Sequence, residues 1–367
     1  MATGFVFHEL YLWHDTGHAA LFFAPGLTVQ PGEHAENPET KRRMKNLLEV
    51  SGQTDHLTVL KPRYATEADL ALHHTQDHID RIRTMSAAGG GNASPLTPFG
   101  SGSYEIACLA AGGAIVAMEA VLSGRVQNAY ALIRPPGHHA LADLGMGFCL
   151  FANAVLAIKS ARVTHGIGRV AVVDWDVHHG NGTQAAFYED PDTLTISIHQ
   201  DNLFPAASGG LSERGTGAGE GYNLNIPLPP GCGNGAYLEV MRRVVLPALD
   251  RFRPEAIVVA CGFDASGADP LGRMMVTSEG YRAMTAMLME AADRLCAGRL
   301  MMTHEGGYSA AYVPYCGLAV LEQLSGIRSG IQDPFQPVMA DYGQQDLQPH
   351  QTTAIAAAAG ALLAGIR

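Results

Sequence analysis

The sequence predicts an α/β protein in which helices cover both faces of a parallel β-sheet. From residue 104 onward, short apolar runs rich in β-branched residues alternate with segments of helical length and periodicity. Runs that are apolar throughout indicate strands buried on both faces, which are typical of parallel sheets joined by crossover helices. The expected strands are residues 129–133, 170–173, 194–198, 257–260 and 300–303, and the expected helices are 105–122, 151–163, 237–252 and 278–297.

The segments outside this alternating region also favour helices. Residues 41–50 and 65–86 have helical character, and Thr66 followed by two acidic residues suits the first turn of a helix. The alanine-rich run 354–366 predicts a packing helix, because it is shorter than the ~20 residues needed to span a bilayer. No repeat or linker is visible, so we expect a single domain over residues 1–367.

Composition limits the expected partners and compartment. The chain carries a formal charge of −11, whereas phosphate binding needs clustered lysine and arginine, so we expect no nucleic-acid partner. The N-terminus lacks a basic region followed by an uninterrupted apolar stretch, so we expect neither a signal peptide nor a membrane segment. Six scattered cysteines without a CxxC pair indicate reduced thiols in the cytoplasm, and Cys261 is expected to be a core residue.

Four of the expected strands run directly into polar clusters. These clusters are Arg134-Pro-Pro-Gly-His-His139, Asp174-Trp-Asp-Val-His-His-Gly-Asn181, Gly262-Phe-Asp264 and His304-Glu-Gly-Gly-Tyr308. The carboxyl ends of parallel strands share one edge of the sheet, and ligands bind there. We therefore expect clusters that are far apart in the sequence to meet in space and to serve one function.

Asp176 and His178 are the first candidates for metal ligands. In extended backbone, residues i and i+2 point the same way, so both side chains could reach one ion, and Asp264 could supply a third ligand. One nitrogen and two carboxylate oxygens suit a catalytic zinc site with an open position, and ferrous iron is a realistic substitute. The competing interpretation is that these residues only cap strand ends. The other clusters at the same edge favour the metal site.

The same edge offers candidates for acid–base chemistry and for oxyanion stabilisation. His138 and His139 lie in a stiff Pro-Pro-Gly turn that suits proton transfer, and Asp174 and Asn181 could orient their rings. Tyr308 follows two glycines that let the chain turn sharply, so its hydroxyl could donate a hydrogen bond to an oxyanion. Taken alone, the histidines could be surface loop residues and the tyrosine a packing residue.

Seven motifs spread over most of the chain fit one known family. They are RPPGHHA (134–140), GFCLFAN (147–153), VDWDVHHGNGTQ (173–184), ISIH (196–199), AGEGYNLNIPL (218–228), CGFDASGADPLG (261–272) and HEGGY (304–308). Together they resemble the histone deacetylase family, and most of all its class II branch and the bacterial histone deacetylase-like amidohydrolases. Weaker similarity extends upstream through residues 34–43. The resemblance implies the arginase/deacetylase fold, a central, mostly parallel eight-stranded sheet flanked by helices.

The resemblance also implies roles for individual residues. Zinc would be held by Asp176, His178 and Asp264. His138 and His139 would carry out acid–base catalysis. The His138 ring would be hydrogen-bonded to Asp174 and the His139 ring to Asn181. An asparagine at this second position is typical of class II members. Tyr308 would polarise the substrate carbonyl. The narrow channel that grips an acyl-lysine stem would be formed by Phe148 and Phe204, with Gly147, Leu271 and Gly306 beside them.

Two structural potassium sites are implied by the same resemblance. The first would involve Asp174, Asp176, His178, Ser197 and Ile198, partly through backbone carbonyls. The second would involve Phe187, Asp190, Thr193 and Tyr222.

The implied activity is zinc-dependent hydrolysis of acetyl or acyl amides, with release of acetate. Expected substrates are acetylated lysine side chains or small acylated amines, and a homo-oligomer is expected by analogy. An acetylpolyamine amidohydrolase is the nearest alternative, although similar polyamine enzymes carry an acidic residue where this chain has Leu271. A ureohydrolase of the arginase type would need further ligands for two metals. A non-catalytic acyl-amine-binding protein would typically lose one of the site residues.

Overall fold

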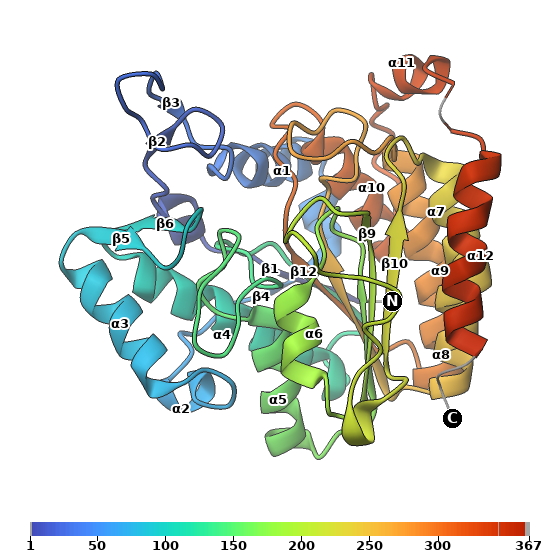
Figure 1. Ribbon diagram of the computed structural model, residues 1–367, viewed down its shortest axis with the longest axis horizontal. Helices are drawn as coiled ribbons and strands as arrows, with labels where there is room; N and C mark the ends of the chain where they lie inside the picture. Colours follow the sequence, from blue (N-terminus) through green and yellow to red (C-terminus); the bar gives the residue numbers. More distant parts are fainter. Residues whose placement is uncertain (1, 344, 364–367) are drawn as a thin grey trace.

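The centre of the computed structural model, which describes residues 2–343 and 345–363, is an eight-stranded β-sheet (Figure 1). The strand order is β10-β9-β8-β11-β12-β7-β1-β4, and every neighbouring pair is parallel. The α/β architecture expected from the sequence is confirmed. The strands of this sheet are β1 (Thr3–Val6), β4 (Leu57–Leu60), β7 (Asn128–Ala131), β8 (Val170–Asp174), β9 (Thr193–Gln200), β10 (Asn223–Leu228), β11 (Ala256–Cys261) and β12 (Leu300–His304). Two antiparallel ribbons lie outside it, β2 (His18–Ala19) with β3 (Gly32–Glu33) and β5 (Gly90–Asn92) with β6 (Pro98–Gly100).

All five strands expected from apolar runs are present, with ends shifted by at most two residues. The other three strands of the sheet lack such a run. Strand β1 contains Gly4, and β4 and β10 lie at the two edges of the sheet, where a strand needs less apolar surface. In β10 the buried polar residues Asn223 and Asn225 donate hydrogen bonds to Gln184 Oε1 over 2.7 and 2.8 Å, which gives their buried NH2 groups an acceptor.

Each face of the sheet buries its own hydrophobic core. Side chains alternate along a strand, so Ile257 and Val259 of β11 pack on one face while Ala256 and Val258 pack on the other. The first core receives side chains from α7 (Asn234–Val240), α8 (Leu246–Phe252), α9 (Ser278–Cys296) and α10 (Val313–Ser325), and the second from α4 (Ser103–Leu122) and α5 (Asn153–His165) (Figure 1). The alanine-rich C-terminal run forms α12, which packs beside β10. Its expected end at residue 366 lies outside the described residues.

The helices agree with the sequence except near residue 70. The segment 65–86, whose sequence indicates helical structure, forms two helices with a break between them. Thr66 caps the first, accepting from Asp69 N, and Thr75 caps the second, accepting from His78 N. The chain breaks between them because Thr75 N donates to Ala142 O instead of to the preceding turn. The helices are α1 (Glu39–Val50), α2 (Glu67–Leu70), α3 (Gln76–Ala87), α4 (Ser103–Leu122), α5 (Asn153–His165), α6 (Asn181–Phe187), α7 (Asn234–Val240), α8 (Leu246–Phe252), α9 (Ser278–Cys296), α10 (Val313–Ser325), α11 (Gln336–Asp341) and α12 (Pro349–Leu363), with a π-helical segment (Met241–Val245) joining α7 to α8.

Helix α4 is long and apolar enough, by length and composition, to cross a membrane. In the fold, however, 78% of its most apolar window is buried within the protein. Its side chains form much of the core on one face of the sheet and pack against α5 and β7. The apolar composition of α4 is therefore explained by its place in the core.

Arg134 anchors the N-terminal segment beneath the loop that follows β7. Its fully buried guanidinium donates to both carboxylate oxygens of Glu36 over 2.8 and 3.0 Å. It also donates to the carbonyl oxygens of Tyr11 and His14 over 3.2 and 2.6 Å. Lys41 lies 3.3 Å from the same carboxylate. This buried ionic group holds the loop that carries His138 and His139 against the start of the chain.

Replacing Arg134 with methionine is expected to lower the free energy of unfolding at pH 7 by about 3–5 kcal/mol, because Glu36 loses its main partner in the interior. Burial raises the pKa of Glu36, but Arg134 and Lys41 outweigh burial and bring that pKa below its ordinary value of 4.5. A carboxyl group with a lowered native pKa stabilises the fold above its unfolded pKa and loses this contribution as the pH falls further. Urea titrations at pH 7 and pH 3.5 should therefore show a smaller difference between wild type and variant at the acidic pH. If the free energies of unfolding of wild type and variant differed as much at pH 3.5 as at pH 7, the ion pair between Arg134 and Glu36 would not explain the loss of stability.

Candidate active site

Four loops meet at the carboxyl edge of the sheet, following β7, β8, β11 and β12. The first two loops are joined where His138 Nε2 lies 3.7 Å from Asp176 Oδ1. The loop after β11 reaches them through Asp264, whose Oδ2 lies 3.1 Å from His178 Nδ1. The loop after β12 brings the Tyr308 ring to 6.4 Å from the His178 ring, measured between centroids. The structure thus gathers side chains from four distant segments in one region.

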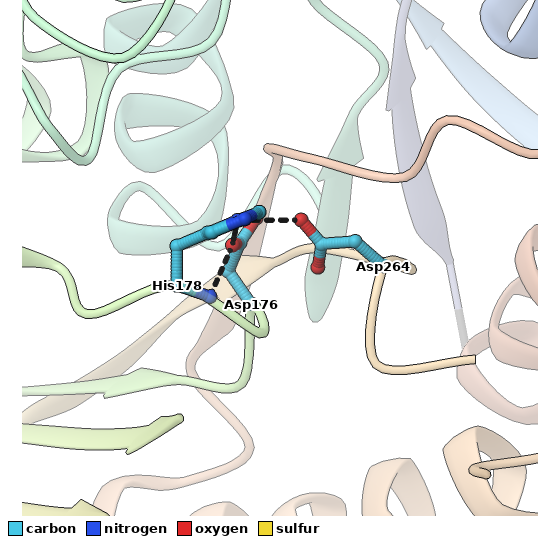
Figure 2. Close-up of side chains that lie close together, drawn as sticks. All are labelled: Asp176, His178 and Asp264. Atoms are coloured by element: carbon cyan, nitrogen blue, oxygen red, sulfur yellow. Dashed lines mark hydrogen bonds and ion pairs between the residues drawn. The ribbon is translucent and has the colours of Figure 1, made fainter. Parts of the chain in front are cut away.

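Asp176, His178 and Asp264 form the centre of this region (Figure 2). His178 Nδ1 lies 3.0 Å from Asp176 Oδ1 and 3.1 Å from Asp264 Oδ2, the contacts that run between these side chains in Figure 2. One possible ligand atom from each residue lies within 4.8 Å of the others, and all three residues are buried. Within the described part of the chain, this is the one group of three or more His, Cys, Asp or Glu residues with such spacing.

The surroundings of these three residues fit a divalent cation. Burial alone would lower the pKa of His178, but its hydrogen bonds to Asp176 and Asp264 outweigh burial and raise that pKa to about 10. A proton is therefore held between two buried carboxylates, at a place where a metal ion would supply positive charge instead. Glycines leave room for the carboxylates: a Cβ on Gly262 would lie 2.3 Å from Asp176 Oδ2, and one on Gly306 would lie 2.1 Å from Asp264 Oδ2.

The two histidines of the Pro-Pro-Gly loop have different partners. His138 Nδ1 lies 2.9 Å from Asp174 Oδ2, and His139 Nδ1 lies 2.7 Å from Asn181 Oδ1. Because an amide oxygen only accepts, His139 Nδ1 carries its proton and Nε2 is left as an acceptor. Burial lowers the pKa of both rings. At His138 the charges of Asp176 and Asp174 outweigh burial and raise its pKa well above the ordinary value, whereas at His139 the neighbouring His138 lowers the pKa further. One imidazole holds a proton and its neighbour can accept one.

Tyr308 is placed by a backbone that depends on glycine. Gly307 has a φ of 118°, which residues with a Cβ rarely adopt. The Tyr308 ring makes an edge contact with Phe148 at 5.8 Å between centroids. Burial and the negative charges of Asp264 and Asp176 raise the pKa of Tyr308 well above its ordinary value. The phenol therefore keeps its proton at neutral pH and remains a hydrogen-bond donor.

A narrow, mostly apolar cavity of about 140 Å³ reaches these residues. Gly147, with a φ of 52°, forms part of its wall, and a Cβ there would lie 2.4 Å from the His139 ring. Gly306, which the resemblance places beside the channel, is not among the residues that line the cavity, and its N–H donates to Asp176 Oδ2 over 2.8 Å. The cavity is lined by Phe22, Leu96, His139, Gly147, Phe148, His178, Leu203, Phe204, Leu271 and Tyr308.

Three of the lining residues were not predicted from the sequence. Phe22 precedes all of the matched segments, and Leu96 lies between the weak segment 34–43 and the first strong motif at 134–140, so no local pattern marks either residue. Leu203 directly precedes the predicted wall residue Phe204, and that adjacency is the only signal that could have identified it. All three add apolar surface to the channel.

Known proteins resemble this chain over most of its length. Residues 34–324 match the histone deacetylase domain, and this range contains every site residue described above except Phe22. A histone deacetylase-like amidohydrolase from Pseudomonas aeruginosa is 55% identical over 337 residues, which cover 91% of this chain and 89% of the relative. A probable deacetylase from Archaeoglobus fulgidus is 38% identical over 338 residues, with coverage of 91% and 89%. The crystal structure of the HDA15 HD domain matches with a TM-score of 0.84 at 32% identity, covering 99% of this chain and 96% of that chain.

The domain match and the identity to the Pseudomonas protein decide the relationship. The chain belongs to the histone deacetylase family. The resemblance drawn from the motifs is confirmed, and so is the eight-stranded fold that it implied. Family membership supports a deacetylase or amidohydrolase activity on acetylated amines.

The two potassium sites implied by the histone deacetylase resemblance remain predictions. At the first, Asp174 and Ser197 are register partners on β8 and β9, and Ser197 Oγ lies 2.9 Å from His199 Nδ1. At the second, the Arg162 guanidinium already lies 2.6 Å from an Asp190 oxygen and 2.8 Å from Thr193 Oγ1. Any ion at the second site would therefore share its surroundings with a fixed positive charge.

Glu305 is a buried carboxylate of this histone deacetylase-family site to which the sequence assigned no role. Its Oε2 accepts hydrogen bonds from the backbone N–H groups of Gly137 and His138 over 2.7 and 3.1 Å. Its Oε1 accepts from Thr303 Oγ1 over 2.8 Å. The carboxylate therefore holds the histidine loop to the end of β12. The residue lies inside the HEGGY motif, but only the folded loop shows which amides face it.

Replacing Glu305 with alanine is expected to destabilise the protein by about 1–3 kcal/mol for each backbone donor left without an acceptor. Glutamine should cost less, because its oxygen can keep both amide partners while the Thr303 hydroxyl turns to accept from its NH2 group. Urea unfolding of the two variants at equal protein concentration compares them directly. Equal destabilisation by alanine and glutamine would mean that these hydrogen bonds do not decide the stability of the loop.

Proposed function

We propose that the chain is a zinc-dependent amidohydrolase that removes acetyl or other acyl groups from lysine-like amines. The observation that carries the proposal is the apolar channel, which ends at the buried Asp176, His178 and Asp264 group between a histidine pair and Tyr308. One imidazole and two carboxylates form a donor set that suits zinc, and the histone deacetylase family is generally zinc-dependent. Ferrous iron accepts the same donors, so the metal is part of the test.

The chain's own residues supply the proton transfers and the oxyanion contact. A bound zinc ion would contribute Lewis acidity at the acyl carbonyl. The Tyr308 hydroxyl donates a hydrogen bond to the carbonyl oxygen as that oxygen gains negative charge. His139 Nε2 takes a proton as water attacks the carbonyl carbon, and His139 then returns a proton to the departing amine. His138 lies beside this exchange, with its Nδ1 held 2.9 Å from Asp174 Oδ2.

The channel walls favour an uncharged aliphatic stem over a polyamine. Among the residues that line the cavity there is no aspartate or glutamate, so a second ammonium group in a substrate would find no carboxylate partner there. Phe148, Phe204 and Leu271 instead offer apolar surface to methylene groups. We infer that acetyl-lysine-like amines are preferred over acetylpolyamines.

The remaining alternatives receive less support. A two-metal ureohydrolase would need further clustered ligands, and the described residues provide a single group of three. A non-catalytic binding protein would have no use for two imidazoles, each with its Nδ1 held by a polar side chain, beside a tyrosine donor.

The test is a deacetylation assay on a fluorogenic acetyl-lysine peptide and on N-acetylspermidine. The rate of hydrolysis of each substrate is measured with the purified protein, with the protein after a chelator has removed its metal, and with the protein after zinc or ferrous ion has been added back. We expect hydrolysis of the peptide, loss on chelation, recovery with zinc, and one bound metal per chain by elemental analysis. We also expect kcat/KM to be at least about tenfold higher for the peptide, which corresponds to about 1.4 kcal/mol. Failure of metal-loaded protein to hydrolyse any acyl amide would refute the proposal.

A further inference from the structure

Asp269 is a buried carboxylate that bridges two sides of the channel. Its Oδ2 accepts a hydrogen bond from the backbone N–H of Tyr308 over 2.7 Å, and its Oδ1 accepts from the N–H of Leu271 over 2.8 Å. Tyr308 and Leu271 both line the cavity, whereas Asp269 itself does not. Only 9% of Asp269 is exposed. One carboxylate thus connects a wall residue to the residue proposed to contact the substrate carbonyl.

The position of Tyr308 depends on few other backbone contacts. Gly306 N donates to Asp176 Oδ2 over 2.8 Å, and Gly306 O accepts from Phe263 N over 2.9 Å. Gly307 follows in a conformation that glycine adopts without strain, so it adds no restraint of its own. The next restraint along the chain is the bond between Tyr308 N and Asp269. This bond fixes the residue that carries the phenol.

The burial of Asp269 is unusual because no cation accompanies it. No lysine, arginine or histidine forms an ion pair with it among the described residues. Its two oxygens are matched instead to two backbone N–H groups, which can only donate. An asparagine of the same shape offers one oxygen and one NH2 group, so one of the two amides would face another donor. Burial and the negative charge of Asp264 raise the pKa of Asp269 to about 8, and a carboxyl group keeps acceptor capacity on its oxygens when it is protonated. A side chain with two acceptor oxygens is therefore required for both bonds.

We propose that Asp269 is a positioning residue for Tyr308: it holds the tyrosine backbone against the channel wall at Leu271, so that the phenol meets the substrate carbonyl. The inference rests on the proposed function of Tyr308. It assigns Asp269 no contact with substrate or metal. Its effect on turnover therefore passes through the Tyr308 hydroxyl and should disappear when that hydroxyl is removed.

The experiment is a double-mutant cycle with Asp269→Asn and Tyr308→Phe, assayed on the acetyl-lysine peptide. In the wild-type background, Asp269→Asn is expected to lower kcat about 10- to 100-fold, since a misplacement of about 1 Å can cost that much. In the Tyr308→Phe background, the same substitution should lower kcat less than about threefold, because residues that act through one another are not additive. Zinc content should be unchanged in all four proteins.

Asp69→Asn is the matched control, because Asp69 Oδ2 also accepts from a backbone amide, that of Thr66 over 2.7 Å, but lies outside the channel lining. It should leave kcat within about twofold. Equal losses of kcat in both backgrounds, loss of zinc from Asp269→Asn, or undiminished turnover would each overturn the proposal. If Asp269→Asn does not fold, Asp269→Ser, whose hydroxyl keeps one acceptor, goes through the same cycle.

Amide hydrogen exchange separates this proposal from the proposed function. Exchange over residues 306–310 should be faster in Asp269→Asn than in wild type and unchanged in Asp69→Asn. That measurement needs no turnover, so it tests the positioning of Tyr308 even if the wild-type protein hydrolyses no acyl amide. Unchanged exchange in Asp269→Asn would show that the carboxylate does not restrain this segment.

Discussion

Asp264→Ala is expected to abolish stable zinc binding and to lower deacetylation by at least about 10³-fold, equivalent to about 4 kcal/mol of lost transition-state stabilisation. The substitution removes one of two buried carboxylates and leaves only Asp176 and His178 as ligands. A site with one negative ligand neutralises less of the charge of a divalent ion, and a vacant ligand position lets water compete. Elemental analysis after dialysis and turnover of the acetyl-lysine peptide measure the two effects.

Asp341→Ala provides the control for this prediction, because Asp341 is an exposed carboxylate at the end of α11. It should keep zinc and activity at wild-type levels. Asp264→Ala also leaves Val177 N without its acceptor, so we expect it to lose about 1–3 kcal/mol of stability but to remain folded. Stoichiometric zinc in Asp264→Ala together with wild-type turnover would exclude this residue as a metal ligand.

The sequence predicted the centre of the fold better than its edges, for a physical reason. Strands β8 and β11 are covered on both faces, so nearly every residue in them is apolar and the run is visible without any partner. Strand β10 is an edge strand whose two asparagines donate hydrogen bonds to Gln184, a residue on α6. Its burial depends on a contact between distant segments, so its own sequence does not look like a strand.

The same distinction separates the predicted from the unpredicted parts of the site. Asp176, His178 and Asp264 could be named because parallel strands deliver their carboxyl ends to one edge, a consequence of topology alone. Phe22 could not, because it reaches the channel from an irregular N-terminal loop whose path is set by tertiary contacts. One such contact is the bond between Arg134 and Glu36.

Asp269 and Glu305 show a further limit. Both lie inside the family motifs at 261–272 and 304–308, yet the motifs alone give neither residue a role. A buried carboxylate acts here through the backbone amides that face it, and any residue type can present an amide. The identity of the partners is therefore absent from the sequence pattern. Only the conformation of the loops shows that one carboxylate holds His138 and the other holds Tyr308.

Tyr308→Phe is expected to lower kcat about 10²- to 10³-fold, the usual cost of removing one oxyanion donor. The ring contact with Phe148 does not involve the hydroxyl, so the channel should keep its shape and KM should change little. The raised pKa of Tyr308 supports a donor role, because a phenol that stays protonated can donate but cannot act as a base near neutral pH. Steady-state kinetics, with zinc content measured in parallel, test this prediction.

Tyr315→Phe, which alters a tyrosine outside the channel lining, should leave kcat unchanged. Full activity in Tyr308→Phe would mean that the substrate carbonyl is stabilised without this hydroxyl, and the oxyanion contact would have to be sought elsewhere in the site.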